Sequence, residues 1–130
     1  MVFTDPEVAQ VGLTEAQAAA HRGARVAYLP MRKADRAVTA GRTEGFIKII
    51  AGPRPVLGKT GGGRVLGATV VAARAGEMIQ EPALAMRTGM FTGRLAQAAH
   101  AYSTWSLAIQ QAAAQFFGQF GGRAARNARP

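Results

Sequence analysis

The sequence predicts an α+β domain in which an antiparallel β-sheet packs against helices. Three observations lead to this prediction. Segments with the alternation or β-branched content of strands occupy the first half of the chain. Segments with helical periodicity cluster in the second half. No clear strand–helix–strand unit for dinucleotide binding is present, and strands followed by helices favour an antiparallel sheet covered by helices.

The predicted strands come early and are short. They span residues 8–13, 26–29, 44–50 and 65–71. The last two are separated by a Gly/Pro-rich stretch, residues 52–63, which predicts a hairpin with a long tip. A short helix is expected after the first strand, because Thr14 and Gln17 form a capping box and Gly23 supplies a stop.

Three helices are predicted in the second half, at residues 76–86, 94–99 and about 105–117. Pro82 lies inside the first of these and is expected to bend it, because proline lacks a backbone donor. Glu77 and Glu81 are four residues apart and would share a face of a continuous helix. Paired carboxylates can divide acid and base roles, but solvation at a helix surface explains these two, and neither has a histidine nearby in sequence.

Composition limits what the chain does. Its 130 residues fit one domain, and a hydrophobic content of 48% is enough for a core. The absence of cysteine excludes disulfides, thiolate metal sites and cysteine redox chemistry within this chain, and suits the cytoplasm, where we expect the protein. No apolar run is long enough for a membrane span, and the first residues lack a signal-peptide pattern. The abrupt first strand is typical of a domain cut from a longer protein.

The charge is strongly basic. Lys and Arg number 16 against 7 Asp and Glu, for a net charge of +9. The arginines are scattered, and three of them lie in the final ten residues. Composition predicts a folded domain over residues 1–117 and a flexible basic tail over residues 118–130. A free-standing basic module that binds nucleic acid, or a structural interaction module, remains the less favoured alternative.

Two glycine-rich motifs do not meet the requirements of nucleotide binding. Gly58-Lys59-Thr60 would need a glycine at Pro53 to form a phosphate loop, and it lies between two predicted strands. The glycines at 61–63 lack the last glycine of the dinucleotide fingerprint, where Leu66 stands. No nucleotide or metal site is therefore predicted in this chain. His21 is interpreted as a helix-end histidine.

The segment from His100 to Ser106 is the candidate functional segment. It is a polar and aromatic link between two predicted helices, and such loops carry function more often than helix interiors. The plainer interpretation is that Tyr102 and Trp105 pack while their polar atoms find partners.

Six stretches, in this order, carry a resemblance to a known family: residues 2–15, 35–37, 44–48, 66–68, 75–81 and 100–104. Together they resemble the C-terminal dimerisation domain of the flavin-dependent pyridine nucleotide-disulfide oxidoreductases, which include dihydrolipoamide dehydrogenase, glutathione reductase and mercuric reductase. The resemblance extends over nearly all of the chain outside the tail. It implies a symmetric homodimer formed through the sheet and late helices, with Trp105 and Phe116 as interface residues.

The resemblance also implies a parent protein. In the family, FAD and NAD(P) domains and a redox cysteine pair precede this domain, so FAD and NAD(P) are expected in the parent and no cofactor in this chain alone. Enzymatic activity is accordingly expected of the parent and not of the isolated chain. The family's closing motif, His-x-His-Pro-Thr followed by Glu, reaches the partner's flavin and disulfide.

The closing motif differs here at three positions. Tyr102 stands in place of the catalytic His, Ser103 in place of Pro, and Leu107 in place of the orienting Glu. A tyrosine at position 102 resembles the closing motif of the mercuric reductase branch, although the extra C-terminal cysteines of that branch are absent here. By resemblance, Tyr102 is the candidate catalytic residue, and Tyr102 with Ser103 the candidate cofactor contacts. The imidazole and the carboxylate that orients it are lost together. This joint loss points to an enzyme with a different substrate, and not to a damaged lipoamide enzyme. A non-catalytic relative is a third possibility.

Overall fold

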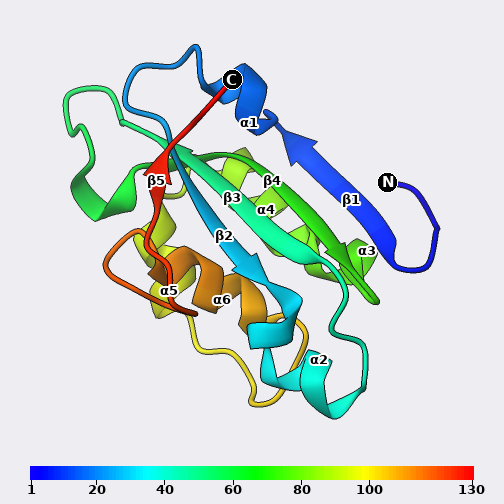
Figure 1. Ribbon diagram of the computed structural model, residues 1–130. Helices are drawn as coiled ribbons and strands as arrows, with labels where there is room; N and C mark the ends of the chain where they lie inside the picture. The colour runs from blue at the N-terminus through cyan, green and yellow to red at the C-terminus, as the bar shows by residue number, and fades with distance from the viewer.

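A five-stranded antiparallel sheet forms the centre of the protein, as the sequence predicts (Figure 1). The computed structural model describes residues 1–130. The strands are β1 (Glu7–Gly12), β2 (Arg25–Pro30), β3 (Phe46–Gly52), β4 (Arg64–Ala72) and β5 (Arg126–Asn127), in the spatial order β1-β4-β3-β2-β5. β3 and β4 form the predicted hairpin, and β1 pairs with β4 instead of with β2, which follows it in the chain.

Six α-helices accompany the sheet. They are α1 (Glu15–Ala18), α2 (Asp35–Thr39), α3 (Ala75–Met78), α4 (Gln80–Arg87), α5 (Thr92–Gln97) and α6 (Leu107–Ala114), with 3₁₀ turns at Met31–Lys33 and Thr60–Gly62. The helices of the second half, α3 to α6, supply one side of the main core, whereas α1 contributes to a smaller cluster. None of the helices combines the length and apolar character that a membrane crossing requires.

The capping box at Thr14 is confirmed. The Thr14 hydroxyl accepts a hydrogen bond from the Gln17 backbone N–H, and the Gln17 side chain accepts one from the Thr14 backbone. The helix is shorter than the sequence suggests, because it ends at Ala18.

The helix predicted over residues 76–86 is two helices. α3 ends at Met78 and α4 begins at Gln80, with Ile79 between them. Pro82 lies in the first turn of α4, where a missing backbone donor breaks no helical hydrogen bond. Glu77 and Glu81 are therefore on different helices, and the continuous helix face that would pair them does not exist.

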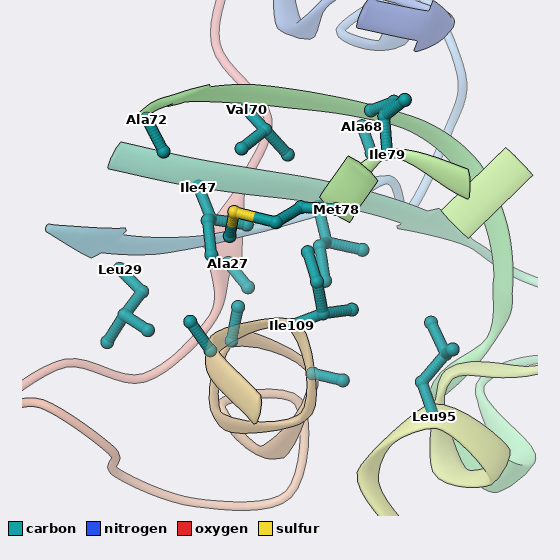
Figure 2. Close-up of a cluster of buried hydrophobic side chains, with 14 of the residues drawn as sticks. Ala27, Leu29, Ile47, Ala68, Val70, Ala72, Met78, Ile79, Leu95 and Ile109 are labelled. Carbon is teal, nitrogen blue, oxygen red and sulfur yellow. The ribbon is translucent and has the colours of Figure 1, made fainter. Parts of the chain in front are cut away.

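The core lies between the sheet and the late helices (Figure 2). Alternation along the strands places Leu29, Ile47 and Val70 on one face, opposite one another in register. Figure 2 shows these side chains directed toward Met78 and Ile109 from the helical layer. Both helical residues are fully buried. This packing holds α3, α4 and α6 against the sheet and so fixes the ends of the segment that joins α5 to α6.

The predicted tail contains secondary structure. β5 pairs with β2, the Arg126 guanidinium contacts the Glu15 carboxylate, and the Ala128 N–H donates to the Ala24 carbonyl at 3.0 Å. Composition did not indicate this, because the contacts are made by backbone groups, one ion pair and two small side chains, Ala125 and Ala128, which pack against the hydrophobic clusters. The flexibility of residues 118–130, and the boundary at 117, stay predictions.

Gln115 continues the edge of the sheet where β5 ends. This side chain is 1% exposed. Its Oε1 accepts from the Tyr28 N–H at 2.9 Å, and its Nε2 donates to the Tyr28 carbonyl at 2.8 Å and to the Phe120 carbonyl at 3.0 Å. A side-chain amide thus satisfies backbone groups of β2 that no strand reaches.

Glu15 makes the stability of the protein sensitive to acid. The hydrogen bond from Arg126 is the main cause that lowers the pKa of Glu15 from 4.5 to about 2, against the opposing effect of burial and with a further contribution from Lys48, whose Nζ lies 2.9 Å away. A carboxylate with a lowered pKa in the folded state adds stability above its unfolded pKa, and this stability is lost as pH falls toward the folded value.

We therefore expect the free energy of unfolding to fall between about pH 4.5 and pH 2, and this fall to be smaller in Glu15→Gln. Urea unfolding at several pH values measures it. Glu77→Gln is the matched control, because Glu77 is exposed and makes no ion pair. The same pH dependence in wild type and Glu15→Gln would contradict the assignment.

Candidate functional site

The segment between α5 and α6 presents Tyr102 to the surroundings. α5 ends at Gln97 and α6 begins at Leu107, so residues 98–106, here called the Tyr102 loop, connect them (Figure 1). The Tyr102 side chain is 77% exposed. The peptide bond between Tyr102 and Ser103 is cis.

His100 holds the first part of this loop. Its side chain is 7% exposed. Nδ1 lies 2.7 Å from the Ala98 carbonyl oxygen, and Nε2 lies 2.5 Å from the Oε1 atom of Glu81 on α4. Both ring nitrogens therefore have a partner, and the imidazole connects the loop to a helix that packs on the sheet.

Thr104 holds the second part of the loop. Its hydroxyl donates to the Ala101 carbonyl at 2.8 Å and accepts from the Leu107 N–H at 3.2 Å. The second contact satisfies a backbone donor in the first turn of α6. Trp105 packs against the main core. Tyr102 and Ser103 lie between these two anchors.

The electrostatic surroundings of Tyr102 favour its protonated form. Asp35, the first residue of α2, raises the pKa of Tyr102 by accepting a hydrogen bond from the hydroxyl and by its negative charge. The ordinary pKa is already about 10. At neutral pH the phenol is therefore a hydrogen-bond donor and not a base.

The Tyr102 loop does not enclose a site within this chain. None of the concave surfaces of the protein is lined by Tyr102 or Ser103. No group of three or more His, Asp or Glu side chains lies together in a way that could hold a metal ion. What the loop offers at the surface is the phenol of Tyr102, which is 77% exposed, with Ser103 half-buried beside it.

The structure adds two residues that sequence reasoning did not assign. Glu81 was set aside because no histidine is near it in the sequence, yet the fold brings His100 to its carboxylate. Asp35 reaches Tyr102 from α2, and no sequence pattern indicates that contact. His21 is exposed after α1 and takes no part in this loop.

Leu107, in contrast, lies where sequence reasoning expects it. It is the first residue of α6, directly after the Tyr102 loop. Its apolar side chain supplies no carboxylate to the loop.

Comparison with protein families gives a match over most of the chain. The family model described as "Pyridine nucleotide-disulphide oxidoreductase, dimerisation domain" matches residues 1–113. Its bounds exclude most of the C-terminal segment that carries β5.

Similar curated proteins are dehydrogenases and reductases. The chain is 36% identical over 119 residues to dihydrolipoyl dehydrogenase of Haloferax volcanii, which covers 91% of this chain and 24% of that protein. It is 40% identical over 107 residues to mercuric reductase of Shewanella putrefaciens, which covers 80% of this chain and 18% of that protein. The chain thus spans about a quarter or less of the length of these relatives.

Solved structures share the fold. LpdA from Mycobacterium tuberculosis superimposes with a TM-score of 0.74 at 35% identity, covering 85% of this chain and 23% of that chain. The HOCl-induced flavoprotein disulfide reductase RclA from Escherichia coli superimposes with a TM-score of 0.72 at 26% identity, covering 82% of this chain and 23% of that chain.

Proposed function

Since the chain belongs to the dimerisation-domain family of the pyridine nucleotide-disulfide oxidoreductases, we propose that it serves as the C-terminal dimerisation domain of a flavin-dependent, NAD(P)H-linked oxidoreductase. The observation that carries this proposal is the family match over residues 1–113, together with the fold that LpdA shares over 85% of this chain. By itself this chain supplies only part of an active site. The parent protein is the enzyme.

The cofactors belong to the other domains of the parent in this proposal. The glycines at 61–63 lie in a turn between two strands and not at the start of a helix, so they lack the geometry that binds a dinucleotide phosphate. FAD and NAD(P), when bound in the parent, would supply hydride and electron transfer. The exposed phenol of Tyr102 and the half-buried Ser103 beside it fit a contact with the edge of such a group, but this chain has no cradle for the whole cofactor.

The role we assign to Tyr102 follows from its protonation state. A neutral phenol donates a hydrogen bond to a developing thiolate or to a substrate oxygen. The phenol is a poor base at neutral pH. Leu107 provides no carboxylate that would help Tyr102 to act as a base. We therefore assign Tyr102 as a donor in the partner subunit's active site, with Ser103 as a neighbouring contact.

The proposed assembly is a homodimer formed through the helical layer. Leu84 on α4 is 61% exposed, and we assign it as an apolar contact of this interface. Phe116, which the sequence suggests as an interface residue, is 6% exposed and packs in the core instead. The interface therefore uses other apolar groups.

Self-association tests this proposal. Sedimentation equilibrium of the 130-residue chain should give a two-fold species, because an isologous interface pairs two copies. Leu84→Glu is expected to shift the equilibrium toward monomer. Val56→Glu is the control, because Val56 is fully exposed at the tip of the β3–β4 hairpin. A strict monomer at high concentration, or equal effects of both variants, would count against the helical interface.

The sequence that precedes Met1 in the parent gives a second check. A flavin-binding glycine-rich turn and a cysteine pair there are the expected features. The matches to dehydrogenases and reductases give no support to the alternative of a nucleic-acid-binding module. A cytoplasmic location remains part of the proposal.

A further inference from the structure

The contact between His100 and Glu81 requires a defined arrangement of protons. The Ala98 carbonyl only accepts hydrogen bonds, so the Nδ1 atom of His100, 2.7 Å away, carries a proton and donates it. The Nε2 atom lies 2.5 Å from the Glu81 Oε1 atom. Two lone pairs would repel at that distance, so a proton lies between these atoms. The contact is then a hydrogen bond made by a ring whose side chain is 7% exposed.

Glu81 lies on a helix that packs against the sheet. It lies in the first turn of α4, and α4 is held against β4 through residues such as Ala85, which is 1% exposed. His100 is two residues before Tyr102 in the loop. The Glu81 carboxylate therefore connects the rigid helical layer to the part of the loop that precedes the exposed phenol.

We propose that Glu81 and His100 are positioning residues, which together fix the direction in which the loop presents Tyr102. The inference rests on the proposed function, in which Tyr102 acts on the partner subunit. Thr104 anchors the other side of the loop, so Tyr102 is held between two fixed points. A hydrogen bond gained inside a catalytic loop reduces the freedom that the reacting group must otherwise lose.

This arrangement explains how the loop is ordered although Leu107 brings no carboxylate to it. The carboxylate that contacts the loop comes from α4, on the side of His100 and not on the side of α6. Glu81 does not touch the phenol. It acts on Tyr102 through His100 and the intervening backbone.

The single tryptophan provides a direct test, because Trp105 lies in the same loop and is half-buried. In the 130-residue chain, Glu81→Ala and His100→Ala should each raise acrylamide quenching of Trp105 roughly 2–3-fold. The double variant should add little to His100→Ala, since that single change already removes the contact with Glu81. Far-UV circular dichroism should stay unchanged.

Rescue and control variants separate positioning from general loss of packing. Glu81→Gln should stay near wild type, because its amide donates to a neutral Nε2 while Nδ1 still donates to Ala98. Glu77→Ala and His21→Ala alter an exposed carboxylate on α3 and the other histidine, and should change nothing. Unchanged quenching in Glu81→Ala, or an equal increase in Glu77→Ala, overturns the proposal.

A measurement on the wild-type chain covers the case in which an alanine variant does not fold. The long-range ¹H–¹⁵N spectrum of the histidines should show a protonated Nδ1 for His100. An unprotonated Nδ1 overturns the proposal. Neither readout depends on turnover, so a failed catalytic role of Tyr102 and a failed Glu81–His100 contact give different results.

Discussion

Tyr102→Phe in the full-length parent protein is expected to lower turnover by roughly 10–100-fold with flavin content unchanged. Phenylalanine keeps the ring and removes only the hydroxyl. Asp35 keeps that hydroxyl protonated by raising its pKa, so the group lost is a hydrogen-bond donor. A donor that strengthens its bond as negative charge develops on sulfur or oxygen stabilises the transition state more than the ground state.

The measurement is steady-state oxidation of NAD(P)H with a quinone or disulfide acceptor. Tyr28→Phe is the matched control. Tyr28, the other tyrosine of the chain, lies on β2 and stacks on Phe46 with ring centroids 5.2 Å apart. Its variant should keep the wild-type rate. Equal rates for Tyr102→Phe and wild type would leave Tyr102 as a packing or interface residue.

Gln115→Leu is expected to lower the free energy of unfolding by roughly 3 kcal/mol. Leucine has nearly the same volume, so the change leaves the packing largely intact and removes three hydrogen bonds. The N–H and carbonyl of Tyr28 then remain without partners at a partly buried position. Each buried polar group without a partner costs about 1–3 kcal/mol.

Urea unfolding measures this difference directly. Gln119→Leu makes the same substitution at an exposed residue four positions later, and should alter stability by less than about 0.5 kcal/mol. If the two variants were equally stable, the edge of β2 would not depend on the Gln115 amide. The result also bears on the Tyr102 loop, because Gln115 follows α6 and ties it to the sheet.

The local elements were predictable from the sequence because their signals are local. Alternation identified the strands on either side of the long hairpin tip, and the Thr14–Gln17 pair marked the start of α1 to the residue. The same reasoning failed at Pro82, where a bend within one helix was predicted. Proline is equally compatible with the first turn of a new helix, and the chain has its break at Ile79, between α3 and α4.

The candidate site was predictable in part. The polar link from His100 to Ser106 marked the loop, and the resemblance of residues 100–104 to the family's closing motif pointed to Tyr102 and Ser103 within it. The contacts that Glu81 and Asp35 make with this loop were not predictable. Glu81 is 19 residues from His100 in the sequence, and Asp35 is on a separate early helix. A carboxylate finds such a partner through the arrangement of helices, which sequence spacing does not encode.

The sequence by itself determined an antiparallel α+β domain, its hairpin and the loop that carries Tyr102. These follow from periodicity and turn chemistry acting over a few residues. The tertiary structure alone decided that β1 pairs with β4, that Arg126 binds Glu15, and that Glu81 binds His100. Each of these contacts joins segments that are not neighbours in the sequence, so no local pattern of residues encodes it.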